Sequence, residues 1–393
     1  MKLTALLSCC SLALFSCLNT ASAAELKIHT DISQKEKPAT IKVRLVKDKP
    51  SVLIETKGGY FVYNAQNGLL LNSSSSPKRH TASLHPDGIS WGESFLGISS
   101  IRIVPADTSS LLIDGIEYRG CIEVHGTQKG CLIINEVDIE RYLKSILTFQ
   151  LGEEIHNEVL EAAAIAARTY AYFCAKENSS SLWHVDAQEV GYSGAGLTLQ
   201  NIPVEQAINH TRNMAMTFRG NLFPAAWTKN SAGKTAEFSA VFRKNVQTPR
   251  GVALPMTAKS RPRYGWFFEI SKQQLAQVVG SQRIDDISLY QDKESEKIYA
   301  VQLKSDTGSR SVDFFTLQKA LGSAKLKSND FQISIAGDKV RFSGYGEGHG
   351  VGLCLESAKE FADQGEKAQQ ILSHFFPGHQ LHCGLPSEEE VKN

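Results

Sequence analysis

The hydrophobic pattern of this 393-residue chain changes from the period of strands to the period of helices near residue 138, and that change limits the folds available to it. Within residues 26–134, stretches such as residues 41–46 alternate polar and apolar side chains, which predicts strands. Beyond it, Asp138 is placed to cap a helix whose apolar face is formed by Ile139, Tyr142, Leu143, Ile146 and Leu147. We therefore predict an α+β fold, with a β-rich unit first and mixed helices and strands after it.

A second helix is predicted from residue 159 to residue 171, where the apolar face consists largely of alanine. Small side chains allow close helix packing, so we expect this helix to be buried. Arg168 lies on it, and a buried arginine needs carboxylate or carbonyl partners. A structural ion pair is therefore one role for Arg168, and a place beside a binding site is the other.

The remaining segments give weaker signals. Residues 71–86, with four consecutive serines, are expected to form a loop. Strands should return between about residues 211 and 343, and Gly220-Asn221 indicates a hairpin that joins residues 214–219 to residues 222–226. Two helices are predicted near the end, at residues 355–364 and 368–375.

The first 23 residues have the layout of a secretory signal peptide. Lys2 precedes an apolar stretch from residue 3 to residue 18, and Ala21-Ser22-Ala23 is a suitable cleavage site. An uncleaved anchor and lipid attachment at Cys17 are the alternatives. The formal net charge of the chain is +1, which provides no general field for nucleic acid. We therefore expect an exported protein that does not bind nucleic acid.

An odd number of cysteines remains after the signal segment, so at least one thiol is unpaired or pairs between chains. They are Cys121, Cys131, Cys174, Cys354 and Cys383. An exported chain permits disulfides, and Cys121 and Cys131 flank an expected hairpin turn at residues 127–130, which makes them the best pair by proximity. Their spacing matches no zinc motif, so a cysteine-ligated metal is not expected.

Three segments have residue types suited to a ligand site. From Gly344 to Gly352 every second residue is glycine, which permits close backbone approach, and His349 lies within this segment. It lacks the ending of a phosphate-binding loop, and a tight structural crossing is the alternative reading. Residues 231–235 form a hydroxyl-rich turn after Trp227, and residues 150–154 join two helices and carry two glutamates. Nucleophile-elbow and zincin motifs are absent, which disfavours those hydrolases.

Taken in order, these segments resemble the SpoIID/LytB family, which includes stage II sporulation protein D and the amidase-enhancer proteins. The matching segments are residues 118–120, 135–137, 142–144, 163–171, 231–235, 348–352 and 375–378. Each match is weak alone, but the ordered set spans about two thirds of the chain.

The resemblance implies action on bacterial peptidoglycan in the periplasm or cell envelope. Sporulation members are lytic transglycosylases, which cleave the glycan between MurNAc and GlcNAc and leave a 1,6-anhydro end. Their substrate is glycan from which an amidase has removed the peptide stems. One carboxylic acid suffices for this reaction, because the 6-hydroxyl of the sugar is the nucleophile, unlike the carboxylate pair of ordinary glycoside hydrolysis.

The chain departs from the family at the position of the essential glutamate, which aligns with Gln150. A carboxamide cannot donate a proton as a carboxylic acid does. Three hypotheses follow: Glu153 or Glu154 replaces the acid, Glu347 supplies it, or the chain binds glycan without cutting it. Some members carry a Cys/His metal pair in the segment matching residues 181–194, where this chain has only His184, so neither metal nor cofactor is expected.

The sequence therefore predicts a signal peptide at 1–23, a β-rich region at 24–134, a SpoIID-like domain at 135–383 and a charged tail at 384–393. The expected catalytic positions are Gln150, Glu153 and Glu154. The expected substrate-binding residues are Arg168, Tyr192, Trp227, Ser231, Gly233, Lys234, Thr235, Tyr345, Gly348, His349 and Gly350.

Two functions are carried forward from these residues. The first is a lytic transglycosylase that cleaves peptide-stripped glycan during envelope remodelling, division or sporulation. The alternative is a non-catalytic glycan-binding protein that recruits or enhances a peptidoglycan amidase. Glycan strands are the expected partner in both, and a cell-wall amidase is a further one.

Overall fold

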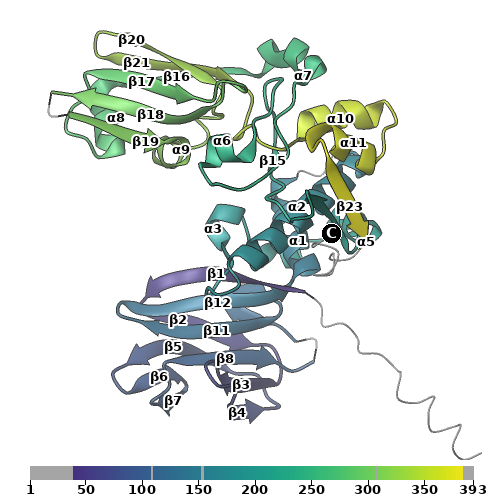
Figure 1. The fold of residues 1–393 in the computed structure, drawn as a ribbon. Helices are drawn as coiled ribbons and strands as arrows, with labels where there is room; N and C mark the ends of the chain where they lie inside the picture. The colour runs from purple at the N-terminus through teal and green to yellow at the C-terminus, as the bar shows by residue number, and fades with distance from the viewer. Residues whose placement is uncertain (1–38, 108, 152–154, 307, 384–393) are drawn as a thin grey trace, which may run out of the picture. The chain divides into compact units, whose positions relative to one another are not determined.

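The computed structural model describes residues 39–383 except residues 108, 152–154 and 307 (Figure 1). The predicted signal peptide and the predicted charged tail lie outside the described residues. Helices and strands are both abundant in the part described, and the predicted α+β class is confirmed. No helix among the described residues has the length and apolar character needed to cross a membrane.

The N-terminal strands form two antiparallel sheets, apart from one parallel pairing. The larger sheet has, in spatial order, β13 (Val185–Asp186), β1 (Thr40–Lys49), β12 (Gly130–Asp138), β11 (Cys121–Thr127), β8 (Ser100–Pro105), β3 (Tyr60–Asn64) and β4 (Leu70–Ser74). The other has β10 (Ile116–Tyr118), β9 (Leu111–Ile113), β2 (Ser51–Thr56), β5 (Arg79–His85), β6 (Gly88–Trp91) and β7 (Glu93–Leu96). Strands β11 and β12 contact β5, and β12 also contacts β2, so the two sheets face each other across a shared core that includes the fully buried Trp91.

Two local predictions for this region are wrong. Residues 71–86 are not a loop, because strands β4 and β5 occupy most of that stretch. Cys121 and Cys131 are free thiols that lie far apart along the β11–β12 hairpin, since Cys121 pairs with Glu136 whereas Cys131 pairs with Gly126. The predicted domain boundary after residue 134 falls inside β12 and stays a prediction.

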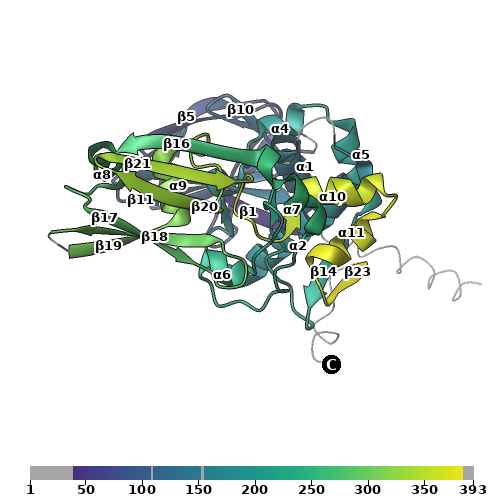
Figure 2. The same cartoon turned by 90° about the horizontal axis from the view of Figure 1, so that it is seen from above.

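A group of helices follows the sheets. Asp138 caps α1 (Ile139–Gln150), as predicted, by accepting the backbone N–H groups of Glu140 and Arg141. The alanine-rich α2 (Asn157–Glu177) is buried along most of its length and contacts α1, α5 (Ile202–His210), α10 (Leu355–Asp363) and α11 (Ala368–Phe375), as Figure 2 shows. The short helices α3 (Ala187–Val190) and α4 (Ala195–Thr198) lie between α2 and α5 in sequence. Helices α10 and α11 confirm the two helices that were predicted near the end of the chain.

The hairpin predicted at Gly220-Asn221 is only half correct. The tight turn forms, because Phe218 and Asn221 exchange backbone hydrogen bonds. However, β14 (Met214–Phe218) pairs with the distant β23 (His379–Cys383) and not with residues 222–226. Pro224 lacks the N–H that a paired strand would need there.

The rest of the chain contains two three-stranded sheets around a separate apolar core. One sheet has the order β16 (Gly265–Ser271), β21 (Lys339–Tyr345) and β20 (Phe331–Ala336), and the other the order β17 (Asp286–Gln291), β18 (Ile298–Ser305) and β19 (Gly308–Asp313). The core between them includes Trp266, Leu303, Phe314 and Phe342. Helices α6 (Phe238–Phe242), α7 (Pro255–Ser260), α8 (Lys272–Val279) and α9 (Phe314–Leu321) and a 3-10 turn (Arg261–Tyr264) complete this part.

Candidate functional site

Two segments that are distant in sequence meet in what we term the glycine crossing, residues 227–236 with residues 344–354. Its centre is a parallel pair between β15 (Trp227–Thr228) and β22 (Leu353–Cys354). Isolated bridges join Asn230 to Glu347 and Ala236 to Val351 on either side. The structure therefore brings together the two predicted motifs at residues 231–235 and 348–352.

Glycines allow the two backbones to touch in the crossing. Gly348 has a φ of +102°, and a side chain there would overlap the hydroxyl of Thr228. Gly350 has a φ of +65°, and a Cβ atom there would lie 2.8 Å from Cε of Lys297. The Thr228 hydroxyl accepts the N–H of Gly350 at 3.2 Å and donates to the carbonyl of Glu347 at 3.2 Å. The alternating glycines thus serve a tight crossing of the chain.

A buried lysine lies behind the crossing. Only 1% of Lys297 is exposed, and its Nζ atom donates to the carbonyl of Ser231 at 2.7 Å and to Oδ2 of Asp330 at 2.8 Å. Burial lowers the pKa of Lys297, and the Asp330 carboxylate opposes that shift. Asp330 also accepts from Arg261 at 2.6 Å, and Arg261 lies 4.4 Å above the ring of Tyr345. Sequence reasoning did not find this clamp.

The predicted residues of the 231–235 turn mostly hold the turn itself. Ser231 and Thr235 are buried, and Thr235 Oγ1 accepts the N–H of Val252 at 2.9 Å. Gly233 packs against Ala258. The Ser231 hydroxyl is a buried polar atom without a hydrogen-bond partner among the described residues. Of the four predicted residues in this turn, only Lys234 is partly exposed.

His349 is fixed by the chain around it. Its Nδ1 accepts the N–H of Val351 at 3.2 Å, and a further backbone hydrogen bond involves Trp227. The ring lies 5.1 Å from the ring of Phe242 on α6, centroid to centroid. Burial lowers the pKa of His349 to about 4, although the backbone hydrogen bonds oppose that shift, so the ring is neutral at pH 7. The structure thus gives His349 a role in holding the crossing.

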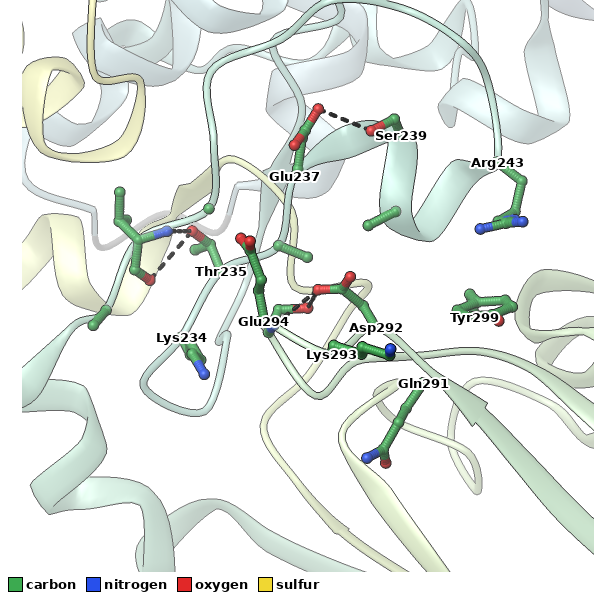
Figure 3. Close-up of a pocket in the computed structure, with 16 residues that line it drawn as sticks. Lys234, Thr235, Glu237, Ser239, Arg243, Gln291, Asp292, Lys293, Glu294 and Tyr299 are labelled. Atoms are coloured by element: carbon green, nitrogen blue, oxygen red, sulfur yellow. Dashed lines mark hydrogen bonds between the residues drawn. The ribbon is translucent and has the colours of Figure 1, made fainter.

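A polar pocket adjoins the crossing (Figure 3). It has a volume of about 580 Å³ and is lined on one side by Lys234 and Thr235, both predicted, and by the segment through α6. The other side is the turn between β17 and β18. Six charged or aromatic lining residues were missed by sequence reasoning: Glu237, Arg243, Asp292, Lys293, Glu294 and Tyr299. Nothing in their local pattern distinguishes them from residues of ordinary solvated turns.

Two predicted substrate-binding residues are corrected by the structure. Arg168 is fully buried and donates to both carboxylate oxygens of Glu140, at 2.8 and 2.7 Å, and to the carbonyl of Met214. Tyr192 is buried as well, donates to Oδ1 of Asn135 at 2.6 Å and stacks on Tyr142. Neither side chain is available to a sugar, and the structural ion-pair reading of Arg168 is confirmed.

The structure describes two of the four candidate acid positions, Gln150 and Glu347. Gln150 is the last residue of α1, and its Nε2 donates to the carbonyl of Val190 at 2.8 Å. Glu153 and Glu154 lie outside the described residues. Glu347 is exposed and pairs with Lys229 at 2.9 Å, a kind of surface pair that contributes little to stability. Trp227 is partly exposed at the crossing, and Tyr345 is 39% exposed.

The residues described in 39–383 contain no group of three or more His, Cys, Asp or Glu side chains suited to a metal ion. His184, the one residue that matches the family's metal pair, accepts the backbone N–H of Lys42 at its Nδ1, at 3.2 Å.

Comparison with known proteins shows that the chain is similar to stage II sporulation proteins and to an amidase enhancer. A family model described as stage II sporulation protein matches residues 127–218. An uncharacterized protein of Chlamydia muridarum is 36% identical over 210 residues, which are 52% of this chain and 72% of that protein. The amidase enhancer of Bacillus subtilis is 24% identical over 71% of this chain and 46% of its own length. Stage II sporulation protein D of Bacillus amyloliquefaciens is 22% identical over 62% of this chain and 74% of its own length.

Proposed function

We propose, because this chain belongs to the SpoIID family, that it binds the glycan strands of peptidoglycan in the periplasm or envelope and cleaves them as a lytic transglycosylase. The observation that carries the proposal is the glycine crossing, in which the two motifs that resemble the family's turn and its glycine-rich ending meet. The amidase enhancer among the relatives supports a role at the cell wall. The predicted signal peptide supports export.

The reaction needs one carboxylic acid. The acid transfers its proton to the glycosidic oxygen while the bond from that oxygen to the anomeric carbon breaks. The 6-hydroxyl oxygen of the same sugar forms the new bond to the anomeric carbon and gives its proton to the carboxylate that the acid has become, which leaves the 1,6-anhydro end and restores the acid. We assign the acid to Glu153 or Glu154, which follow Gln150 in the connection between α1 and α2.

Sugar contacts are assigned to the exposed groups at the crossing. Trp227 and Tyr345 are partly exposed aromatic residues, suited to stacking on sugar rings. Arg261 lies over the Tyr345 ring, so a sugar would use the other face. Lys234 supplies a cation for the lactyl carboxylate of MurNAc. The buried Ser231, Gly233, Thr235 and Gly350, with the half-buried Gly348 and His349, act by holding this surface in place.

A second function is favoured by Gln150 itself. Its carboxamide replaces the family's acid and donates to the carbonyl of Val190. In this alternative the crossing recognises glycan without cleaving it, and the chain recruits or stimulates a peptidoglycan amidase. The relative named amidase enhancer supports this alternative.

The two functions are separated by incubating residues 24–393 with peptide-stripped glycan and analysing the products by mass spectrometry. Fragments with 1,6-anhydro ends are expected from the wild-type protein. A double variant, Glu153→Gln with Glu154→Gln, should bind glycan and release no fragments, whereas Glu177→Gln, at the exposed end of α2, should cleave normally. Wild-type binding without fragments rejects the transglycosylase and supports the second function. Cleavage by the double variant rejects our acid assignment and transfers it to Glu347.

A further inference from the structure

The sheet formed by β16, β21 and β20 has an outer face that is open to solvent (Figure 2). Burial alternates strictly along β21, and its outward side chains are those of Lys339, Arg341, Ser343 and Tyr345. All four are exposed, whereas the inward Phe342 belongs to the apolar core. The outward row is therefore a surface that a ligand can reach.

Two aromatic rings lie next to each other on this face. In the register of β16 and β21, Gly265 is opposite Tyr345, and Phe267 is opposite Ser343. Phe267 is thus the diagonal neighbour of Tyr345, at about 7–8 Å between backbone positions. The exposed fraction is 66% for Phe267 and 39% for Tyr345. One exposed phenylalanine is ordinary, but two neighbouring rings on an open sheet face form a platform on which successive sugar rings can stack.

A guanidinium group lies on each of these rings. Arg261 is 4.4 Å from the centroid of the Tyr345 ring, and Arg341 is 4.5 Å from the centroid of the Phe267 ring. A guanidinium binds a carboxylate through two parallel hydrogen bonds. Each ring therefore has a carboxylate-binding group beside it. We term these four residues, Arg261, Phe267, Arg341 and Tyr345, the aromatic–arginine face.

The carboxylates near the two arginines leave this face with an excess of positive charge. Asp330 accepts from Arg261 at 2.6 Å, but it is shared with the buried Lys297 at 2.8 Å. Glu269 is the one carboxylate among the outward positions of the three strands. It lies 3.8 Å from Arg341, and both side chains are about half exposed, so this pair contributes little to stability.

The remaining outward positions are polar and add no further excess of charge. Gln332 and Ser334 on β20 and Ser343 on β21 are exposed and suited to hydrogen bonds with sugar hydroxyl groups. At the far end of β21, Lys339 is next to Asp338 of the β20–β21 turn, so that end is neutral in sum. The positive charge is therefore concentrated at the two rings.

We propose that the aromatic–arginine face binds the glycan strand where it extends beyond the crossing, and that it recognises the free lactyl carboxylate of MurNAc. While a peptide stem is attached, this carboxyl group is part of an amide bond and carries no charge. Removal of the stems leaves one carboxylate on every second sugar. The inference rests on the proposed function, in which stripped glycan is the substrate, and it deepens that function by naming the residues that select such glycan.

The aromatic–arginine face is continuous with the crossing. Tyr345 belongs to both, and the next residue, Gly346, donates its N–H to the carbonyl of Tyr264 at 3.0 Å. Glu347 then bridges to Asn230 in the other half of the crossing. A glycan strand that leaves the crossing along β21 therefore reaches the Tyr345 ring first, and the Phe267 ring with its guanidinium next.

The test measures the affinity of residues 24–393 for two probes of equal length. One is stripped glycan, and the other is a neutral oligomer of N-acetylglucosamine, which has the same linkage and no lactyl group. We expect the wild type to bind stripped glycan about tenfold more tightly. Arg341→Met should abolish that preference and leave the affinity for the neutral oligomer unchanged. Phe267→Ala should weaken binding of both probes, and Glu269→Gln should tighten binding of stripped glycan alone.

Matched controls come from exposed strands of the N-terminal sheets. Arg79 on β5 lies 3.4 Å from Glu55 on the neighbouring strand, as Arg341 lies near Glu269, and Arg79→Met should change neither affinity. Phe61 on β3 is an exposed phenylalanine, and Phe61→Ala should likewise have no effect. Thermal melting checks that each variant is folded, and the gain expected for Glu269→Gln cannot result from a loss of folding.

The outcomes separate this inference from the proposed function. Equal wild-type affinity for the two probes, or an unchanged preference in Arg341→Met, overturns the inference and leaves glycan binding intact. An oligothymidylate that competes as well as stripped glycan also overturns it, because the face would then bind any polyanion with stacking rings. A preference for stripped glycan without 1,6-anhydro fragments supports the inference and rejects the transglycosylase. A wild type that binds neither probe rejects both.

Discussion

The side-chain nitrogen of Lys297 lies 2.7 Å from the carbonyl oxygen of Ser231, so a buried cation holds the turn of one family motif from behind. The same nitrogen pairs with Asp330, whose backbone carbonyl accepts the N–H of Tyr345 at 2.9 Å. Lys297 therefore joins the two halves of the glycine crossing, although it belongs to neither motif.

Replacing Lys297 tests this clamp. Lys297→Met keeps most of the side-chain volume and removes the charge, which leaves Asp330 with Arg261 as its remaining cation. Removing one partner of a buried pair costs about 3–5 kcal/mol, and we expect a loss of this order in the free energy of unfolding, together with weaker glycan binding. Urea unfolding measures the first effect, with Lys319→Met on the exposed side of α9 as control. A variant as stable as the wild type contradicts the clamp.

The neutral ring of His349 predicts a loss of stability in mild acid. Its pKa is about 4 in the folded chain against 6.5 in the unfolded chain, because burial disfavours the charged form. Between pH 4 and pH 6.5 the unfolded state therefore binds more protons than the folded state. The contribution of the neutral His349 ring to the free energy of unfolding is complete above pH 6.5 and falls as the pH drops toward 4. The difference corresponds to at most about 3 kcal/mol.

Urea unfolding at pH 7, 5.5 and 4 measures this slope. His349→Gln removes the titrating ring and should flatten it, whereas His85→Gln, on an exposed part of β5, should leave it unchanged. Equal slopes for the wild type and His349→Gln would show that the ring is as easily protonated in the folded state as in the unfolded one.

A second, more acidic transition is predicted from Glu123 on β11. Burial alone would raise the pKa of Glu123, but the hydrogen bond from His125 and the charges of Lys42 and Arg102 outweigh it and lower the pKa to about 2. Its contribution, up to about 3 kcal/mol, is complete above the unfolded pKa of 4.5 and is lost as the pH falls toward 2. Glu123→Gln should be less stable at pH 7 and lose less on acidification, as followed by circular dichroism.

Arg168 offers a direct check on the corrected site. Arg168→Met leaves Glu140 without its buried cation, so the free energy of unfolding should fall by about 3–5 kcal/mol. The affinity of the folded protein for glycan should not change, because the guanidinium is fully buried. Arg141→Met, exposed on α1, serves as control. A variant of normal stability that has lost affinity would return Arg168 to the binding surface.

Regular local patterns made much of the fold predictable. The helix after Asp138, the buried alanine-rich helix and the two C-terminal helices all follow from apolar spacing and caps. The partner of β14 did not follow from the sequence, because β14 pairs with a strand at the far end of the chain. The strands β4 and β5 did not follow either, because the serine-rich stretch at residues 71–86 has no apolar alternation to indicate them.

The candidate site was predictable only where motifs exist. The structure brings residues 231–235 and 348–352 together, but which of their side chains face outward depends on the crossing itself. Lys297 lies in a charged stretch, Asp292 to Lys297, which is typical of a solvated turn, and its burial results from packing between distant segments. The pocket carboxylates come from the start of α6 and from the turn between β17 and β18, so spacing along the chain could not associate them.

The pairing of Trp227 with Leu353, and of β14 with β23, also determines when the protein can become folded during its synthesis. Neither contact can form until the ribosome has passed residue 353, and contacts so distant in sequence form slowly. A stop codon shortly before that point removes one strand from each pair, so the crossing loses the parallel strand pair at its centre. Late nonsense mutations in the gene should therefore be as damaging to this protein as early ones.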